Sequence, residues 1–279
     1  VKCAQIHRFV TTIKTIAFVH RLLLTYVEFH DDIEKIEIDA FAECKWLYCI
    51  KLLGVRIIQS EAFCQCERLR DVEFGVELET IESRAFKHCP SLEKIRMPSV
   101  RTIGEAGFWC CEKLSDVECG QDLEKIHAGA FDYCDNLKRI ALPLKDNMFE
   151  YEVFHGCDKL TTVDLVGEIH NTVASLHMKS WRTDMMGLIY HINGFLPELD
   201  ARIDSKTHFI ALWMKAVINK LNRYKAEHHK INKEATSLLE LALWKAKIDE
   251  TGAVTVEERN ACRGEVPGPA KDAIIQYFR

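Results

Sequence analysis

The sequence lacks the long apolar runs, the high proline and glycine content and the one-sided charge that would place it in a specialised class. No apolar stretch approaches the roughly 18 uninterrupted residues of a membrane-spanning helix. Six Pro and thirteen Gly in 279 residues exclude a collagen-like or low-complexity chain. The formal charge of −5 is too small to indicate nucleic-acid binding by the chain as a whole. With 48% hydrophobic residues, the sequence predicts a soluble, folded protein of one or two domains.

Enzyme motifs are also absent. The chain has no G-x-S-x-G nucleophile motif, no Gly-rich phosphate loop followed by Lys and Ser or Thr, no H-E-x-x-H and no dinucleotide-binding fingerprint. The sequence therefore indicates a non-enzymatic protein with no catalytic residue and no cofactor. The N-terminal residues do not have the charged, apolar and small-residue regions of a secretory signal. We expect a cytoplasmic protein because we predict that its cysteines are reduced.

A repeat of 22 or 23 residues organises residues 1–167. Seven units align on a phenylalanine, at Phe18, Phe41, Phe63, Phe86, Phe108, Phe131 and Phe154. A cysteine follows three positions later in every unit after the first, at Cys44, Cys66, Cys89, Cys111, Cys134 and Cys157. Leu stands at position +6, Ile or Val at +9 and a further apolar residue at +11, while Ile stands at −5 in every unit but the last.

This spacing predicts that each unit is one coil of a solenoid. Steps of three residues keep one side of a turn inward, and the closing step of two predicts a short strand with both apolar side chains on one face. A unit of this length cannot bury its apolar side alone, so neighbouring units stack, their strands pair as a parallel sheet and the Phe, Leu and Ile columns form one core. Val1 and Ala4 match Leu24 and Val27 one unit later, and we expect the chain to start within an earlier repeat.

The units resemble a known class of repeat. Residues 78–98 (LETIESRAFKHCPSLEKIRMP) and 123–143 (LEKIHAGAFDYCDNLKRIALP) resemble the BspA-like, Treponema-type leucine-rich repeat, which is found in bacterial surface proteins and in large protist families. The resemblance covers residues 1–167. It implies an α/β fold, a right-handed leucine-rich-repeat solenoid of seven repeats, that binds a protein or another ligand without catalysis.

Helical spacing replaces the repeat from Glu168 onward. Apolar residues step by three and four up to Phe195 and predict a first helix that stops before Pro197. A second stripe predicts a helix from residue 205 to about 247. We interpret residues 168–248 as a helical hairpin or coiled coil whose longer second arm is open to self-association. Residues 249–279 are predicted to be a linker and a short helix over 270–278, and residues 223–235 (RYKAEHHKINKEA) resemble the helical tail of repeat proteins predicted in diatoms.

The seventh unit departs from the pattern and is predicted to be a terminal, capping repeat. It has Asp146 where Val or Leu is expected and Phe149 in place of Ile. We predict that apolar residues of the first helix cover this coil, among Ile169, Val173 and Leu176.

The repeat cysteines do not fit a metal site or a disulfide framework. Zinc sites take ligand pairs two to four residues apart, whereas these cysteines stand one per coil. Neighbouring cysteines on the column would have parallel Cβ vectors about 4.8 Å apart, wider than a relaxed disulfide. We therefore predict reduced, buried thiols. His228 and His229 have no third ligand within sequence reach, so the sequence indicates no metal.

Charges of alternating sign lie on the outer face of the predicted sheet. Opposite charges on neighbouring strands attract by roughly 0.2–1 kcal/mol per pair. The columns are therefore either a self-neutralising ladder that fixes the register or a polar recognition surface. The candidate partner-binding residues are Glu73, Lys94, Arg96, Glu118 and Arg139.

Two functions from different classes follow. The leading hypothesis is a protein–protein interaction scaffold whose partner the sequence does not identify. The alternative is binding of nucleic acid or an anionic surface by the basic second helix, although a charge run is usually a solvated helix face. The residues that would carry it are Lys215, Lys220, Arg223, Lys225, Lys230 and Lys233.

Overall fold

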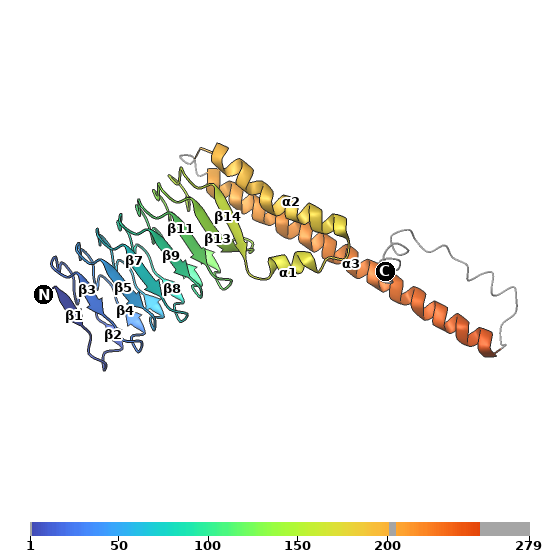
Figure 1. Cartoon of the computed structure of the whole chain (residues 1–279), viewed down its shortest axis with the longest axis horizontal. Coiled ribbons are helices and arrows are strands. Elements are labelled where there is room, and N and C mark those ends of the chain that lie inside the picture. Colours follow the sequence, from blue (N-terminus) through green and yellow to red (C-terminus); the bar gives the residue numbers. More distant parts are fainter. Residues whose placement is uncertain (1, 201–204, 252–279) are drawn as a thin grey trace. The chain divides into compact units, whose positions relative to one another are not determined.

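Stacked coils of the repeat form a parallel β-solenoid, which is followed by helices (Figure 1). The computed structural model describes residues 2–200 and 205–251. The chain divides into a first unit, Val1–His170 with Gly187–Ile218, and a second unit, Asn171–Met186 with Asn219–Arg279. Among the described residues, no helix has both the length and the apolar character needed to span a membrane.

The larger sheet contains the strands that the repeat predicts. Its eight parallel strands are, in spatial order, β1 (Cys3–Gln5), β3 (Tyr26–Glu28), β5 (Cys49–Leu52), β7 (Asp71–Phe74), β9 (Lys94–Met97), β11 (Asp116–Cys119), β13 (Arg139–Pro143) and β14 (Thr162–Val166). The register pairs equivalent repeat positions, as in Ile50 with Val72 and Val117 with Ile140. The inward residues of these pairs are buried, so the predicted register is correct.

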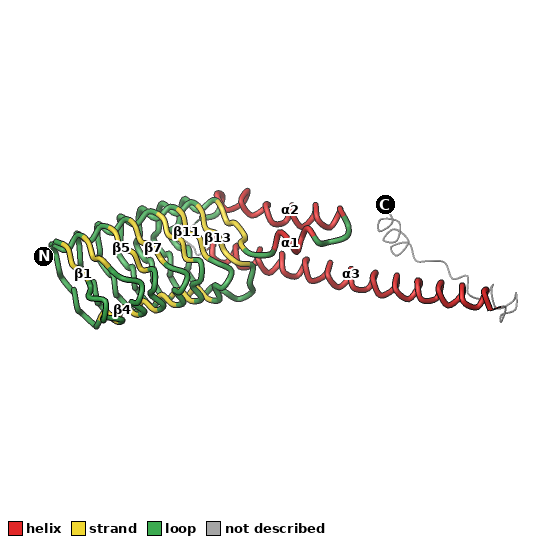
Figure 2. Tube along the Cα trace, turned by 60° about the horizontal axis from the view of Figure 1, so that its bottom comes forward, coloured by secondary structure: helices red, strands yellow, loops and turns green. Residues whose placement is uncertain are grey.

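A second sheet follows the isoleucine column, which the sequence does not predict to be strand. It contains β2 (Thr12–Ile13), β4 (Lys35–Ile36), β6 (Ile57–Ile58), β8 (Thr80–Ile81), β10 (Thr102–Ile103) and β12 (Lys125–Ile126). Figure 2 shows both rows of strands along the solenoid. Each of these strands has only two residues, which is too short to produce a period-two pattern.

Stacked phenylalanine rings form the axis of the core. Ring centroids of neighbouring coils lie 4.8–6.1 Å apart from Phe18 to Phe154, and the rings are parallel within 10°. The six rings from Phe41 onward are fully buried. The residues two before and two after each Phe have positive φ, which turns the chain sharply on both sides of the ring. The predicted continuous core is confirmed.

The six cysteines that stand three positions after a phenylalanine, the column cysteines, are buried and also form hydrogen bonds. The thiols donate to the backbone carbonyl of the phenylalanine in the preceding coil at 3.1–3.3 Å, as Cys89 does to Phe63. All six are buried, and the eleven cysteines of the described residues are free. The thiol thus pairs a buried carbonyl oxygen.

The helical segment differs in two places from the prediction. Where one first helix was predicted, the structure has α1 (Ile169–Ala174) and α2 (Lys179–Phe195), followed by the 3₁₀ turn η1 (Leu196–Glu198). Helix α3 (Ser205–Thr251) continues past Asp249, where the linker was predicted to begin. The rest of the predicted linker and the predicted helix over 270–278 lie outside the described residues.

Helices α2 and α3 contact each other in antiparallel orientation within each unit. In the first unit, the indole Nε1 of Trp213 donates to the Leu188 carbonyl at 2.9 Å. In the second unit, the rings of Trp181 and Tyr224 stack with centroids 4.9 Å apart, and the Tyr224 hydroxyl donates to Asp184.

Polar side chains of the first unit cap the last coil. Lys206 at the start of α3 is 1% exposed, and its Nζ donates to three backbone carbonyls, those of Cys157 (2.9 Å), Asp158 (2.9 Å) and Leu160 (3.1 Å). The Thr207 hydroxyl accepts the Phe154 N–H at 3.0 Å, and the Asn193 amide oxygen accepts the Val163 N–H at 2.9 Å.

The prediction that Ile169, Val173 and Leu176 cover the seventh coil stays a prediction. These side chains are buried, but Val173 and Leu176 belong to the second unit. The end of a solenoid exposes backbone N–H and C=O groups that have no following coil to pair with. Polar donors and acceptors from residues 187–218 meet that need, and the prediction considered apolar cover alone.

Candidate partner-binding surface

Strands β7, β9 and β11 place charged side chains on the outer face of the larger sheet. Within each strand, successive side chains alternate between the core and the outer face. The outer residues are Asp71 and Glu73, Lys94 and Arg96, and Asp116 and Glu118. Because Lys94 pairs in register with both Asp71 and Asp116, a basic strand lies between two acidic ones.

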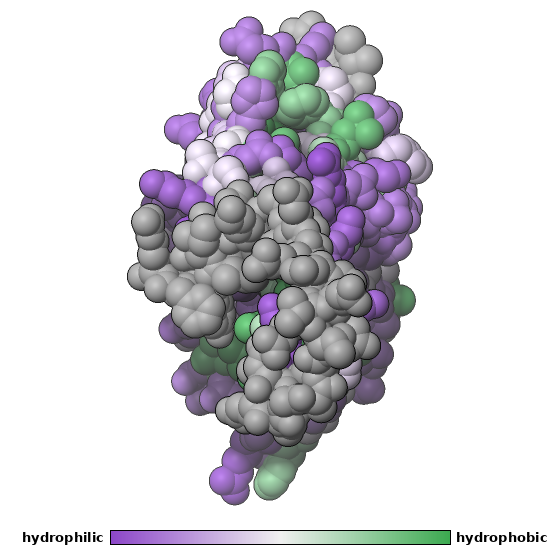
Figure 3. Space-filling view, turned by 90° about the vertical axis from the view of Figure 1, so that its right-hand side faces the viewer, coloured by the Kyte–Doolittle hydropathy of each residue, from purple (hydrophilic) through white to green (hydrophobic). Residues whose placement is uncertain are grey.

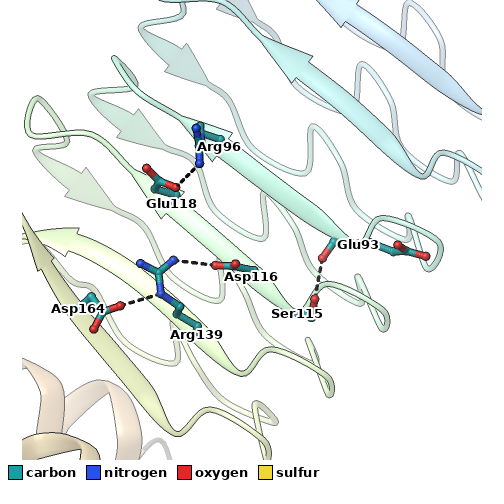
Figure 4. A network of polar contacts seen from close by, with 7 residues as sticks. All are labelled: Glu93, Arg96, Ser115, Asp116, Glu118, Arg139 and Asp164. Atoms are coloured by element: carbon teal, nitrogen blue, oxygen red, sulfur yellow. Dashed lines mark hydrogen bonds and ion pairs between the residues drawn. The ribbon is translucent and has the colours of Figure 1, made fainter.

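Ion pairs join part of this face into a ladder (Figure 4). Arg96 contacts Glu118 at 3.0 Å. Arg139 on β13 bridges two strands, with Nη1 2.9 Å from Asp116 and Nε 2.6 Å from Asp164. The hydrogen bond with Asp116 raises the pKa of Arg139. The ladder hypothesis is correct for Arg96 and Arg139 but not for Lys94, which forms no ion pair among the described residues.

The side chains of Arg96 and Arg139 differ in exposure and therefore in how firmly their ion pairs hold them. The Arg96 side chain is 75% exposed, whereas that of Arg139 is 37% exposed and has two carboxylate partners. An exposed pair such as Arg96–Glu118 contributes only about 0–1 kcal/mol. Arg96 can therefore exchange Glu118 for an external carboxylate at little cost, while Arg139 holds the register.

An open groove of about 410 Å³ lies over these strands. It collects four of the five predicted residues, Glu73, Lys94, Arg96 and Glu118, while Arg139 lies one strand beyond. Among the described residues, no ion pair involves Lys94, whose side chain is exposed. The groove therefore offers one free ammonium and one weakly held guanidinium among four carboxylates.

Exposed aromatic residues near the N-terminal coils escaped the sequence analysis. Tyr26, Trp46 and Tyr48 are 39%, 45% and 47% exposed, and the Arg68 guanidinium lies 3.5 Å from the Trp46 ring centroid. They occupy repeat positions +8, +5 and +7, which carry polar or charged residues in most later coils. That departure from the later coils was the available signal.

The basic residues of α3 are partly neutralised within the chain. Lys220 contacts Asp184 at 2.6 Å, which together with Tyr224 lowers the pKa of that carboxyl, and Arg223 contacts Glu227 at 2.9 Å. The other four predicted residues, Lys215, Lys225, Lys230 and Lys233, are exposed. Hydrophilic residues predominate in the described part of the face shown in Figure 3.

Comparison with known proteins identifies the repeat. The model of the BspA type leucine rich repeat region matches residues 11–99 and 56–177, in six copies. A leucine-rich repeat protein from Bacteroides ovatus shares 27% identity and a TM-score of 0.51, covering 59% of this chain and 43% of that one. The T. pallidum leucine-rich repeat protein shares 32% identity and a TM-score of 0.46, covering 47% of this chain and 63% of that one. The match therefore spans less than two thirds of either structure. No curated protein matches this sequence.

Proposed function

Because the chain belongs to the BspA-type leucine-rich repeat family, we propose that it is a non-enzymatic scaffold that binds a protein partner on the outer face of its eight-stranded sheet. Leucine-rich repeat proteins are typically binding scaffolds, because stacked repeats build a long surface. The observation that carries the proposal is the groove over β7, β9 and β11, in which Lys94 and Arg96 stand among carboxylates.

The charges of the groove define the partner. Carboxylates of the partner would face Lys94 and Arg96, and its basic residues would face Glu73 in place of Lys51, which now lies 2.7 Å from Glu73 in an exposed ion pair. Such alternating charge gives orientation and discrimination between partners more than raw affinity. Arg96 can replace Glu118 by a carboxylate of the partner at little cost in free energy, because an exposed ion pair contributes little.

Charge reversal in the groove tests this function. The full chain is immobilised, and bound proteins are compared between the wild type and the variants Lys94→Glu and Lys113→Glu. Both lysines are exposed, but only Lys94 lines the groove. We expect a partner retained by the wild type and Lys113→Glu to be lost from Lys94→Glu. Equal retention by both variants contradicts a partner site in the groove.

The alternative function rests on the exposed lysines of α3. Binding of nucleic acid or an anionic surface through Lys215, Lys225, Lys230 and Lys233 would weaken steeply with salt, because phosphate contacts release counterions. The ion pairs of Lys220 and Arg223 reduce the charge available for it. Titration of duplex DNA and of anionic vesicles at two salt concentrations tests this alternative.

Self-association through α3 is a further part of the proposal. Leu239 and Leu243 lie one helical turn apart on one face of α3 and are 52% and 67% exposed, and a contiguous apolar patch in water marks an interface. We expect sedimentation of the full chain to show an assembly that Leu243→Glu dissociates and Ser237→Glu, an exposed polar position on another face of the same helix, does not. A monomer at high concentration removes self-association from the function.

We also propose a reducing, cytoplasmic location. The support is the set of eleven free cysteines among the described residues, six of which donate to backbone carbonyls. Disulfides form and persist mainly in oxidising compartments.

A further inference from the structure

Two aromatic rings and two arginines of neighbouring coils contact each other next to the larger sheet. Trp46 and Tyr48 precede β5 in one coil, and Arg68 and Arg70 hold the same repeat positions before β7 in the next. Strands β5 and β7 are neighbours (Figure 1). The Arg68 guanidinium lies 3.5 Å from the Trp46 ring centroid, and Arg70 Nη1 donates to the Tyr48 hydroxyl at 3.4 Å. These four residues are called the Trp46 patch.

Both rings of the Trp46 patch stay accessible although each contacts an arginine. Trp46 is 45% exposed and Tyr48 is 47% exposed. Tyr26, at 39%, pairs in register with Cys49, the residue after Tyr48, so a third exposed ring stands on the adjacent strand β3. Tryptophan, tyrosine and arginine are the residues that contribute most of the binding energy in protein interfaces. The patch therefore has the composition of a binding site.

Arg68 has a positive charge that no carboxylate of the chain compensates. The carboxylates of this coil and the next are engaged elsewhere, because Glu67 contacts Lys45 at 2.8 Å and Glu93 contacts Arg70 at 3.0 Å. Within residues 2–200 and 205–251, Arg68 has no ion pair and no hydrogen bond, and its guanidinium contacts only the indole ring. A guanidinium over an aromatic face keeps its in-plane N–H donors available. Three cations therefore stand beside two carboxylates, and the excess charge is on Arg68.

We propose that the Trp46 patch binds a segment of a partner protein that carries acidic and aromatic side chains. A carboxylate of the segment binds the Arg68 guanidinium through two parallel N–H···O bonds, for which the planar group is suited. An aromatic side chain of the segment packs against Trp46 and Tyr48, since aromatic pairs attract beyond the area they bury. The excess charge of Arg68 repels a basic segment and so sets the sign of the partner.

The Trp46 patch is separate from the groove over β7, β9 and β11. None of its four residues lines that groove. The patch also differs from the groove in kind, because the groove holds alternating charges, whereas the patch combines exposed rings with one uncompensated guanidinium. This proposal therefore does not depend on a partner in the groove.

A labelled random copolymer of glutamate and tyrosine is the probe, and its binding to the full chain is measured by fluorescence anisotropy. We expect Arg68→Gln and Trp46→Ala each to weaken binding at least about tenfold. Arg84→Gln removes an exposed arginine elsewhere on the next coil and should change the affinity less than about twofold, which controls for net charge. Tyr151→Ala, at a 67% exposed position, is the matched control for the loss of a ring.

Two further polymers separate the contributions of charge and ring. Polyglutamate, which has no rings, should bind at least about fivefold more weakly than the copolymer. Binding of a lysine–tyrosine copolymer elsewhere on the chain should not weaken in Arg68→Gln, because the guanidinium repels it. Equal affinity for polyglutamate would overturn the role of the rings, and loss of the basic copolymer from Arg68→Gln would overturn the sign of the partner.

The variant Lys94→Glu distinguishes the Trp46 patch from the groove. We expect it to bind the glutamate–tyrosine copolymer within about threefold of the wild type. Loss from Lys94→Glu with retention by Arg68→Gln would place the acidic segment in the groove and overturn the proposal. Arg68 and Trp46 are exposed, so their replacement leaves the core intact, which circular dichroism verifies. Equal binding by the wild type, Arg68→Gln and Trp46→Ala overturns the proposal as well.

Discussion

At the scale of single residues, the column cysteines combine a small apolar volume with a hydrogen-bond donor. A thiol at +3 donates to the carbonyl of the phenylalanine one coil back, as Cys89 does to Phe63, whose oxygen also accepts the Cys66 N–H at 3.4 Å. Ala at this position would remove the hydrogen bond of the thiol. Burial raises the pKa of Cys66 and Cys89 well above the usual value and raises that of Cys44 to about 11. Because the thiolate is the nucleophile, these groups should be inert in the folded protein.

Thiol titration checks whether the column cysteines are unreactive in the folded protein. Under non-reducing conditions at pH 8, we expect the exposed Cys3 to react fast and the column cysteines to react only after denaturation, when all twelve cysteines of the chain titrate. Cys3→Ser should remove a fast phase, whereas Cys89→Ser should leave the native phases unchanged. Recovery of far fewer than twelve thiols would contradict both the reduced state and the cytoplasmic location.

The buried Lys206 is a second residue with a specific structural role. Lys206→Met keeps the aliphatic volume but leaves the carbonyls of Asp158 and Leu160 without the donor of Lys206, while the Cys157 carbonyl keeps the Leu160 N–H at 3.1 Å. An unpaired buried acceptor costs about 1–3 kcal/mol, so we expect a loss of about 3–5 kcal/mol in the free energy of unfolding, measured with denaturant. Lys215→Met on the exposed side of the same helix should cost under about 0.5 kcal/mol. A similar small cost for both would mean that Lys206 does not cap the coil.

At the scale of the element, each coil contains two residues with positive φ, and most of them are not glycine. Ala106 (φ 52°) and Gly129 (φ 60°) occupy the same position, two before the phenylalanine, in neighbouring coils. A Cβ added at Gly129 would meet only the Asp132 Cβ, at 3.6 Å, so space is available and the backbone conformation alone decides the effect.

These two positions give a matched pair of substitutions. The left-handed conformation costs an L-residue about 1–2 kcal/mol, partly offset by the extra freedom of glycine in the unfolded chain. We therefore expect Ala106→Gly to stabilise the protein by about 0.5–1 kcal/mol and Gly129→Ala to destabilise it by a similar amount. Denaturant unfolding of both variants is the measurement, and shifts of the same sign would contradict the assignment of strain to this position.

Ion pairs between coils make the free energy of unfolding depend on pH. Hydrogen bonds from Arg56 and Arg101 lower the pKa values of Glu79 and Glu124. A carboxyl whose pKa is lower in the folded protein contributes stability that is present above about pH 4.5, its ordinary pKa, and is lost as the pH falls below it. The free energy of unfolding should therefore fall between pH 5 and pH 3.

The variant Glu124→Gln isolates one of these pairs. We expect its free energy of unfolding to fall less steeply than that of the wild type over the same range, because one proton-linked group is gone. The control is Glu105→Gln, which removes an exposed carboxyl that has no ion pair among the described residues. Identical slopes for the wild type and Glu124→Gln would show that the pair does not contribute.

Particular elements show how far sequence reasoning reaches. The Phe and Leu columns repeat seven times and the Ile column six times, so the coils, the larger sheet and the charge ladder of Arg96 and Glu118 follow from spacing. The strands of the second sheet do not, because two residues carry no periodicity. The groove over β7–β11 also needed the structure, since its free ammonium at Lys94 depends on which neighbouring carboxylates pair elsewhere.

At the scale of the whole molecule, contacts of the solenoid run between neighbouring coils. The last coil is the exception, because Lys206, Thr207 and Asn193 contact residues of that coil that lie 30 or more positions away in the sequence. Sequence reasoning placed the cap at Ile169 to Leu176 because it followed the nearest apolar residues. The capping bonds depend instead on where the backbone of the final coil exposes its carbonyls, which a one-dimensional pattern does not encode.

Because each coil packs only against its neighbours, the destabilisation caused by a core substitution should stay local. Phe86 is fully buried, and its ring stacks on Phe63 at 5.1 Å and on Phe108 at 5.3 Å. Phe86→Ala removes both contacts and leaves a cavity, so we expect a cost of about 3–5 kcal/mol in the free energy of unfolding.

In a solenoid this loss of stability is confined to one coil and its two interfaces. Hydrogen exchange should therefore lose protection most in the coils of Phe63, Phe86 and Phe108, while strands β13 and β14 keep theirs. Tyr151→Ala, at a 67% exposed aromatic position, should cost under about 0.5 kcal/mol. A uniform loss of protection from β1 to β14 would show that the solenoid unfolds as one cooperative body.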